Sequence, residues 1–234
     1  MYHFPTDPKK IKQRIKRYER SLRKDDQMRG LRDGYGKRFL LGPLYLMLGN
    51  VQDTLDHYKW YQNTYPDDSG YALNFLCWAI ALYRHGDFEE AEKKVINTML
   101  SNIFLIPYIL EREIPSLDSW EDRCYNELME IEYFPHEILN VITCAEMEWI
   151  KALHNSSKIT TIREKYIEID DQLENLPRGE KRTKLCHELF KIRALDFSGV
   201  DFSEIESDQT SDNSTNPHFS QRWILSCFFV AHGG

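Results

Sequence analysis

The sequence contains no long apolar run, and none of its 234 residues lies in a window with the roughly 18 apolar residues that a membrane-spanning helix needs. Its N-terminal residues also lack the apolar segment of a secretory signal. The chain has five cysteines, which is an odd number, and no two of them form a CxxC pair. We therefore expect a cytoplasmic protein without a membrane span, whose cysteines are reduced and mostly fill the core.

Motifs for catalysis and metal binding are missing as well. The sequence has no HExxH or paired CxxC motif for zinc, no Walker lysine and serine after a glycine-rich stretch, and no GxSxG elbow. Cys186, His187 and Glu188 are adjacent, but neighbours on a helix point in different directions. We interpret them as a core cysteine beside a surface histidine. We expect no metal and no cofactor; an enzyme whose site assembles from distant residues is one alternative.

Charge is distributed unevenly along the chain. Of its 30 Lys and Arg residues, 13 lie in residues 1–38 with only 5 of the 37 Asp and Glu residues, which leaves 17 basic and 32 acidic residues for the remainder. A basic arm on an acidic body either folds back onto that body or binds an anionic partner. Such a partner would be nucleic acid, a membrane surface or an acidic protein. The candidate anion-binding residues are Lys9, Lys10, Lys12, Arg14, Lys16, Arg17 and Arg20.

The spacing of apolar residues predicts helices along most of the chain. In residues 8–24, Ile11, Ile15, Tyr18 and Leu22 form one apolar stripe. Further helices are predicted on both sides of two glycines, Gly49 and Gly86, and over residues 119–131, 136–154, 159–176 and 180–194. At Gly86 we expect a left-handed cap that ends one helix, with Asp87 capping the next. We expect no strand before the apolar C-terminal end.

Two segments around these glycines resemble the helix–turn–helix units of the tetratricopeptide repeat (TPR) family. The glycines are 37 residues apart, close to that family's period of roughly 34 residues. The first unit matches the family pattern at Leu41-Gly42, Tyr45, Gly49, Thr54, Tyr58, Tyr61 and Pro66. The second matches it at Trp78-Ala79, Gly86, Phe88, Ala91 and Val95, but Leu82 replaces the tyrosine and the closing proline is absent.

Other features depart from the family pattern or match it weakly. Pro43 lies inside the first predicted helix and should kink it or mark its start. A faint third unit has Trp149 and Pro177 at the right spacing but no corner glycine. The resemblance therefore covers residues 37–102 and, weakly, 136–177. The alternative is an irregular all-α domain in which one pair of hairpins looks repetitive.

The resemblance implies a fold, and the composition along the chain predicts a domain division. The fold is all-α: a TPR-like right-handed stack of antiparallel helical hairpins with extra C-terminal helices. Residues 1–36 are predicted to form a basic helix and a glycine-rich loop, and residues 37–195 the helical-repeat domain. Residues 196–234 are predicted to be an acidic, disordered tail with an apolar end.

The resemblance also implies a concave groove that binds a ligand. Its inward positions would be Phe39, Leu46, Met47, Leu76, Ile80, Tyr83 and Arg84. Family members that clamp a peptide carboxylate have Lys, Asn and Arg at such positions, whereas here only Arg84 is polar and charged. An apolar groove suits an amphipathic helix from a partner or from this chain's own basic segment. Alternatively, these residues pack against further helices.

We therefore predict a non-enzymatic scaffold that binds a protein or peptide partner in this groove. The alternative is a nucleic-acid-associated adaptor that uses the basic N-terminal helix. The pattern specifies no oligomeric state.

Overall fold

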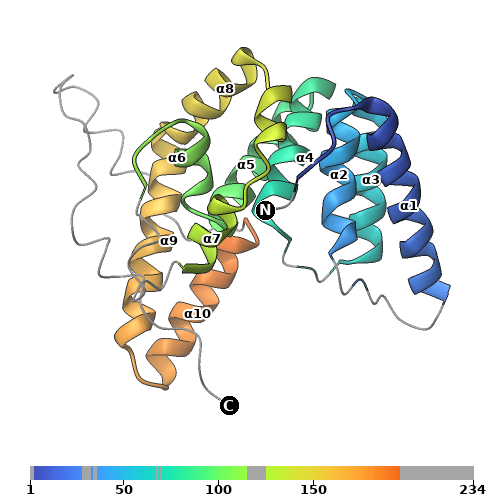
Figure 1. Cartoon of the computed structure of the whole chain (residues 1–234). Helices are drawn as coiled ribbons and strands as arrows, with labels where there is room; N and C mark the ends of the chain where they lie inside the picture. Colours follow the sequence, from blue (N-terminus) through green and yellow to red (C-terminus); the bar gives the residue numbers. More distant parts are fainter. Residues whose placement is uncertain are drawn as a thin grey trace.

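A computed structural model describes residues 3–27, 33, 36–66, 68, 70–114 and 125–195 of the chain. Within these residues, every regular element is a helix and no strand occurs, which confirms the predicted all-α class. Figure 1 shows α1, α2 and α3 side by side at one end, α4 and α5 in the middle, and α9 and α10 at the other end. The predicted tail, 196–234, lies outside the described residues.

Ten α-helices and one 3₁₀-helix make up the described part of the chain. They are α1 (Pro8–Gln27), α2 (Lys37–Met47), α3 (Val51–Thr64), α4 (Ala72–His85), α5 (Phe88–Ser101), α6 (Leu105–Ile109), α7 (Tyr125–Glu132), η1 (His136–Val141), α8 (Cys144–His154), α9 (Ser157–Asn175) and α10 (Glu180–Arg193). None of them is both long enough and apolar enough to cross a membrane.

The basic N-terminal helix α1 packs against the rest of the chain. Asp7 caps it by accepting hydrogen bonds from the backbone N–H groups of Lys9 and Lys10, at 2.7 and 3.1 Å. Ile11, Ile15 and Leu22 from its apolar stripe are buried in the main core, and α1 contacts α2. The basic arm therefore folds back onto the body, and binding of an anionic partner by its exposed residues stays a prediction.

Both predicted corners are present. Gly49 has φ 71° between α2 and α3, and Gly86 has φ 91° between α4 and α5, a conformation that costs glycine little and other residues more. Asp87 caps α5 as predicted, because its carboxylate accepts a hydrogen bond from the Glu90 backbone N–H at 3.3 Å. Each tight corner turns the chain back, so α2 and α3 form one antiparallel hairpin and α4 and α5 form another.

Close packing joins the two hairpins. Gly42 lets α3 approach α2, since a Cβ atom at Gly42 would lie 2.3 Å from the hydroxyl oxygen of the buried Tyr58. The Tyr58 ring in turn stacks on Trp78 of α4, with ring centroids 4.8 Å apart and planes 5° apart. Lys94 of α5 places its Nζ 3.8 Å from the centroid of the Trp78 ring. An aromatic stack thus runs from the first hairpin into the second.

Some predicted boundaries were wrong. Residues 136–154 form two helices instead of one, because η1 ends at Val141 and Thr143 caps the start of α8. The Thr143 hydroxyl accepts a hydrogen bond from the Glu146 backbone N–H, while the Glu146 carboxylate accepts one from the Thr143 backbone N–H. Pro43 does not mark the start of a helix, since α2 begins at Lys37. Part of the helix predicted over 119–131 lies outside the described residues.

The last two helices form a third antiparallel pair, α9 against α10. The inward face of α9 is apolar and includes Ile159, Ile162 and Ile169, which belong to the main core. By contrast, α10 buries only Ile192, and the side chain of Cys186 is exposed instead of lying in the core. The prediction for Cys186 was therefore wrong, because α10 packs mainly on α9 and most of its side chains are exposed. Cys144 is exposed as well, whereas Cys77 is buried as expected.

Candidate functional site

The predicted groove does not form at its apolar positions. Leu46, Leu76 and Ile80 are almost completely buried in the core between helices. They do not line an open surface, because α4, which carries Leu76 and Ile80, packs against α3 and against α2, which carries Leu46. Phe39 and Met47 are half-buried. The ring of Phe39 packs against those of Tyr61 and Tyr71, with centroids 6.0 Å away in both cases.

The remaining two predicted groove residues make contacts with the C-terminal half. Tyr83 packs its ring against Trp149 of α8, with centroids 4.5 Å apart. Arg84 forms two hydrogen bonds to the Glu146 carboxylate and a third to the backbone oxygen of Val141. At these two positions the structure shows the alternative given above, packing against further helices. A partner-binding role for any of the seven residues stays a prediction.

The basic residues of α1 lie mostly in water. Six of the seven candidate anion-binding side chains are exposed: Lys9, Lys10, Lys12, Lys16, Arg17 and Arg20. Arg14 is half-buried and donates a hydrogen bond to the backbone oxygen of His3 at 2.8 Å. Burial of the apolar stripe therefore leaves a basic outer face on α1.

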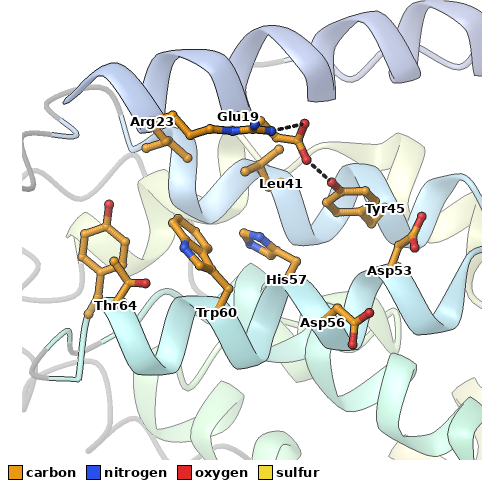
Figure 2. Close-up of a pocket in the computed structure, with 11 residues that line it drawn as sticks. Glu19, Arg23, Leu41, Tyr45, Asp53, Asp56, His57, Trp60 and Thr64 are labelled. Atoms are coloured by element: carbon orange, nitrogen blue, oxygen red, sulfur yellow. Dashed lines mark hydrogen bonds and ion pairs between the residues drawn. The ribbon is translucent and has the colours of Figure 1, made fainter. Parts of the chain in front are cut away.

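An open cleft lies between α1 and α3, with α2 as its floor. Its volume is about 330 Å³, within the range of small-ligand pockets. Figure 2 shows side chains from α1 above it and from α3 below it. Its lining consists of Glu19, Leu22, Arg23, Leu41, Tyr45, Asp53, Asp56, His57, Trp60, Thr64 and Tyr65. We call this set the α1–α3 cleft.

One face of α3 supplies most of the polar and aromatic lining. Asp53, Asp56, His57, Trp60 and Thr64 recur at the spacing of helix neighbours and thus share one side of the helix. The opposite side carries Thr54, Tyr58 and Tyr61, which are buried. Trp60 is 38% exposed, the most exposed large apolar side chain of the cleft. Its ring lies beside those of His57 and Tyr65, at centroid distances of 5.4 and 5.8 Å.

The charge of the lining is negative, with three carboxylates against one guanidinium. Glu19 is already engaged: it accepts a hydrogen bond from the Tyr45 hydroxyl at 2.5 Å and pairs with Arg23 at 3.5 Å (Figure 2). Asp53 accepts a hydrogen bond from the neutral amide of Asn50, and Asp56 accepts one from that of Gln52. Among the described residues, neither aspartate forms an ion pair. Within the described part of the chain, two carboxylates of the cleft thus have no cationic partner.

Burial determines the protonation of two groups in the cleft. It lowers the pKa of His57 to about 4, although a hydrogen bond from Nε2 to the backbone oxygen of Arg38 acts in the opposite direction. The ring is therefore neutral near pH 7, with the proton on Nε2 because a carbonyl oxygen only accepts. Burial is the largest effect that raises the pKa of Tyr45, and the neighbouring Glu19 raises this pKa further. Tyr45 consequently stays a hydroxyl donor to Glu19.

Sequence reasoning missed this cleft. Its signal was present as the stripe of Asp53, Asp56, His57 and Trp60 on the polar side of a predicted helix. From the sequence alone, that stripe predicts an ordinary solvent-exposed helix face, because the sequence does not show that α1 lies opposite it. No group of three or more His, Cys, Asp or Glu side chains in the described parts of the chain is arranged to hold a metal ion.

Comparison with known proteins identifies no relative, since no protein-family model, no curated protein and no solved structure matches this chain.

Proposed function

We propose that this chain is a protein-interaction module, a TPR-like stack of helical hairpins that binds a segment of a partner protein in the α1–α3 cleft. The observation that carries the proposal is the open cleft itself, which has the partly exposed Trp60 at its wall. Exposed aromatic side chains in concave sites are typical anchors of protein interfaces. We therefore place the binding site in this cleft and not in the groove predicted from the sequence, because several residues of that groove are buried.

Three features support a TPR-like arrangement. Two hairpins turn at left-handed glycines, α4 packs against both helices of the preceding hairpin, and small residues permit close approach. Ala79 and Ala91, at the small-residue positions of the second unit, are fully buried. Stacked hairpins are a common scaffold for binding peptides.

A displayed random-peptide library tests the proposed function. The library is selected on immobilised wild-type protein, and the enriched peptides are then measured on Trp60→Ala. The matched control is Phe190→Ala, which removes an exposed aromatic ring from α10, away from the cleft. We expect enriched peptides to lose most of their binding to Trp60→Ala and to keep it on the control. Equal binding to all three proteins would refute the proposal.

A second candidate function is nucleic-acid binding by α1. The observation that favours it is the exposed basic face, since Lys and Arg side chains neutralise phosphates without regard to sequence. Its test is the salt dependence of binding to a labelled oligonucleotide, for wild type and for Lys12→Glu with Lys16→Glu. Binding that falls steeply with salt and is lost in the variant would support this candidate, and no binding at low salt would refute it.

A further inference from the structure

The α1–α3 cleft has a chemical character that narrows the partner. Its unpaired charge is negative, since Asp53 and Asp56 have no cationic partner in the described chain while the single guanidinium, Arg23, is paired with Glu19. The neighbouring His57 is neutral near pH 7 and adds no repulsion towards a cation. An incoming cation would therefore meet two available carboxylates and no free positive charge of the lining.

The spacing along α3 matches a long cationic side chain. Asp56 precedes Trp60 by one helical turn, about 6 Å along the axis, which is comparable with the four-carbon stem of a lysine. A stem that lies on the Trp60 ring would place its charged end beside Asp56 and, one turn further, Asp53. Aromatic faces attract cations, and long basic side chains bury their apolar stems. Both parts of such a side chain find matching groups in the cleft.

We propose that the α1–α3 cleft binds a basic segment of the partner protein by holding one lysine or arginine side chain between Trp60 and the carboxylates of Asp53 and Asp56. This inference rests on the proposed function and names the chemistry of the segment. A small metal ion does not fit the same residues, because the carboxylates of the cleft are not grouped as metal ligands. The charged end of a lysine or arginine side chain does not need carboxylates grouped in this way.

Nuclear magnetic resonance of the indole N–H groups tests the inference. The chain has five tryptophans, and the signal of Trp60 is assigned by its loss in Trp60→Phe. The probes are blocked pentapeptides of glycine and alanine with a central lysine, arginine, norleucine or glutamate. We expect the lysine or arginine peptide to shift the Trp60 signal saturably, and the norleucine and glutamate peptides to bind at least about tenfold more weakly.

Paired variants separate a local effect from general electrostatics. Asp53→Asn with Asp56→Asn removes both available carboxylates, and we expect affinity for the lysine peptide to fall at least about fivefold, as for loss of about 1 kcal/mol of ion pairing. The control, Glu113→Gln with Glu188→Gln, removes two exposed carboxylates elsewhere. We expect its affinity to match that of the wild type. Equal losses in the two double variants would overturn the inference.

The remaining outcomes also discriminate. Equal binding of the norleucine peptide, or no shift with either basic peptide, would overturn the inference. Library peptides that depend on Trp60 yet carry no basic residue would overturn it while the proposed function stands. The absence of any Trp60-dependent peptide would refute the proposed function itself. The Trp60 signal could also shift as the protein concentration rises, without any peptide. If that shift vanishes in Lys12→Gln with Lys16→Gln, the cleft binds α1 of a second copy, and the inference is overturned.

Discussion

Arg84 of α4 holds Glu146 of α8 in a two-point ion pair, with Nε 2.7 Å from Oε1 and Nη2 3.1 Å from Oε2. The two residues are 62 positions apart, so the pair ties the second hairpin to the C-terminal half. Glu146 also completes the capping box at Thr143. Burial raises the pKa of Glu146, but the hydrogen bonds from Arg84 and Thr143 outweigh that effect and keep the pKa below its usual value.

Arg84→Leu should lower the free energy of unfolding by about 3 kcal/mol, because it leaves the buried Glu146 carboxylate without its cation. Chemical denaturation measures the change. Adding Glu146→Gln to Arg84→Leu removes the unpaired charge, so the double variant should be more stable than Arg84→Leu alone. If Arg84→Leu is as stable as the wild type, the pair contributes nothing to the tertiary structure.

Gly42→Ala should cost about 2 kcal/mol or more, since its Cβ atom would overlap the Tyr58 ring. Tyr58 cannot move aside cheaply, because its ring also stacks on Trp78. Thermal or chemical unfolding gives the measurement, and Gly179→Ala is the control because nothing lies within 4 Å of the added atom. Equal stability of the two variants would show that α2 and α3 do not approach through Gly42.

Gly86→Ala should cost about 1 kcal/mol for a different reason. The site has room for a Cβ atom, but its φ of 91° disfavours every residue with one. Because the cause is backbone conformation, Gly86→Asn should cost less than Gly86→Ala. A helix that continued through this position would instead be stabilised by alanine, and a stabilising Gly86→Ala would contradict the corner.

The protein should become less stable as the pH falls, because two buried histidines can gain a proton only after the protein unfolds. Burial lowers the pKa of His57 to about 4, and burial with the nearby Arg163 and Arg112 lowers that of His154 to about 3. Each histidine supports the fold fully above its unfolded pKa of about 6.5, and that support is lost as pH falls towards the folded value. At pH 5 the loss should be about 2 kcal/mol for each.

The acid effect is measured as the free energy of unfolding at pH 7 and at pH 5, above the usual range of carboxylate titration. His154→Gln should flatten the dependence relative to the wild type. The matched control is His187→Gln, because His187 is exposed. A wild-type slope that persists fully in His154→Gln would assign the effect to other groups.

Local signals in the sequence predicted much of the fold. The apolar stripe of α1, the glycine corners and the Asp87 cap depend on neighbouring residues only, and the structure has all three. The division at Thr143 was missed although it is also local, because a capping threonine with glutamate three residues later was read as part of a longer periodic pattern.

The site was less predictable because it depends on contacts between distant segments. Whether Leu76 and Ile80 face a groove or the core depends on which helices cover α4, and periodicity alone does not specify that. The α1–α3 cleft combines residues of three helices, namely α1, α2 and α3, and α3 follows the corner at Gly49. Its acidic and aromatic stripe on α3 becomes a wall only because α1 lies across from it.

The most direct test of the account is the affinity of one library-selected peptide for the wild type and for Trp60→Ala, measured by fluorescence anisotropy with both proteins shown to be folded. We expect the substitution to weaken binding at least about tenfold, which corresponds to about 1.4 kcal/mol, while Phe190→Ala binds as the wild type does. Affinities for wild type and Trp60→Ala within twofold of each other would contradict the assignment of binding to the α1–α3 cleft.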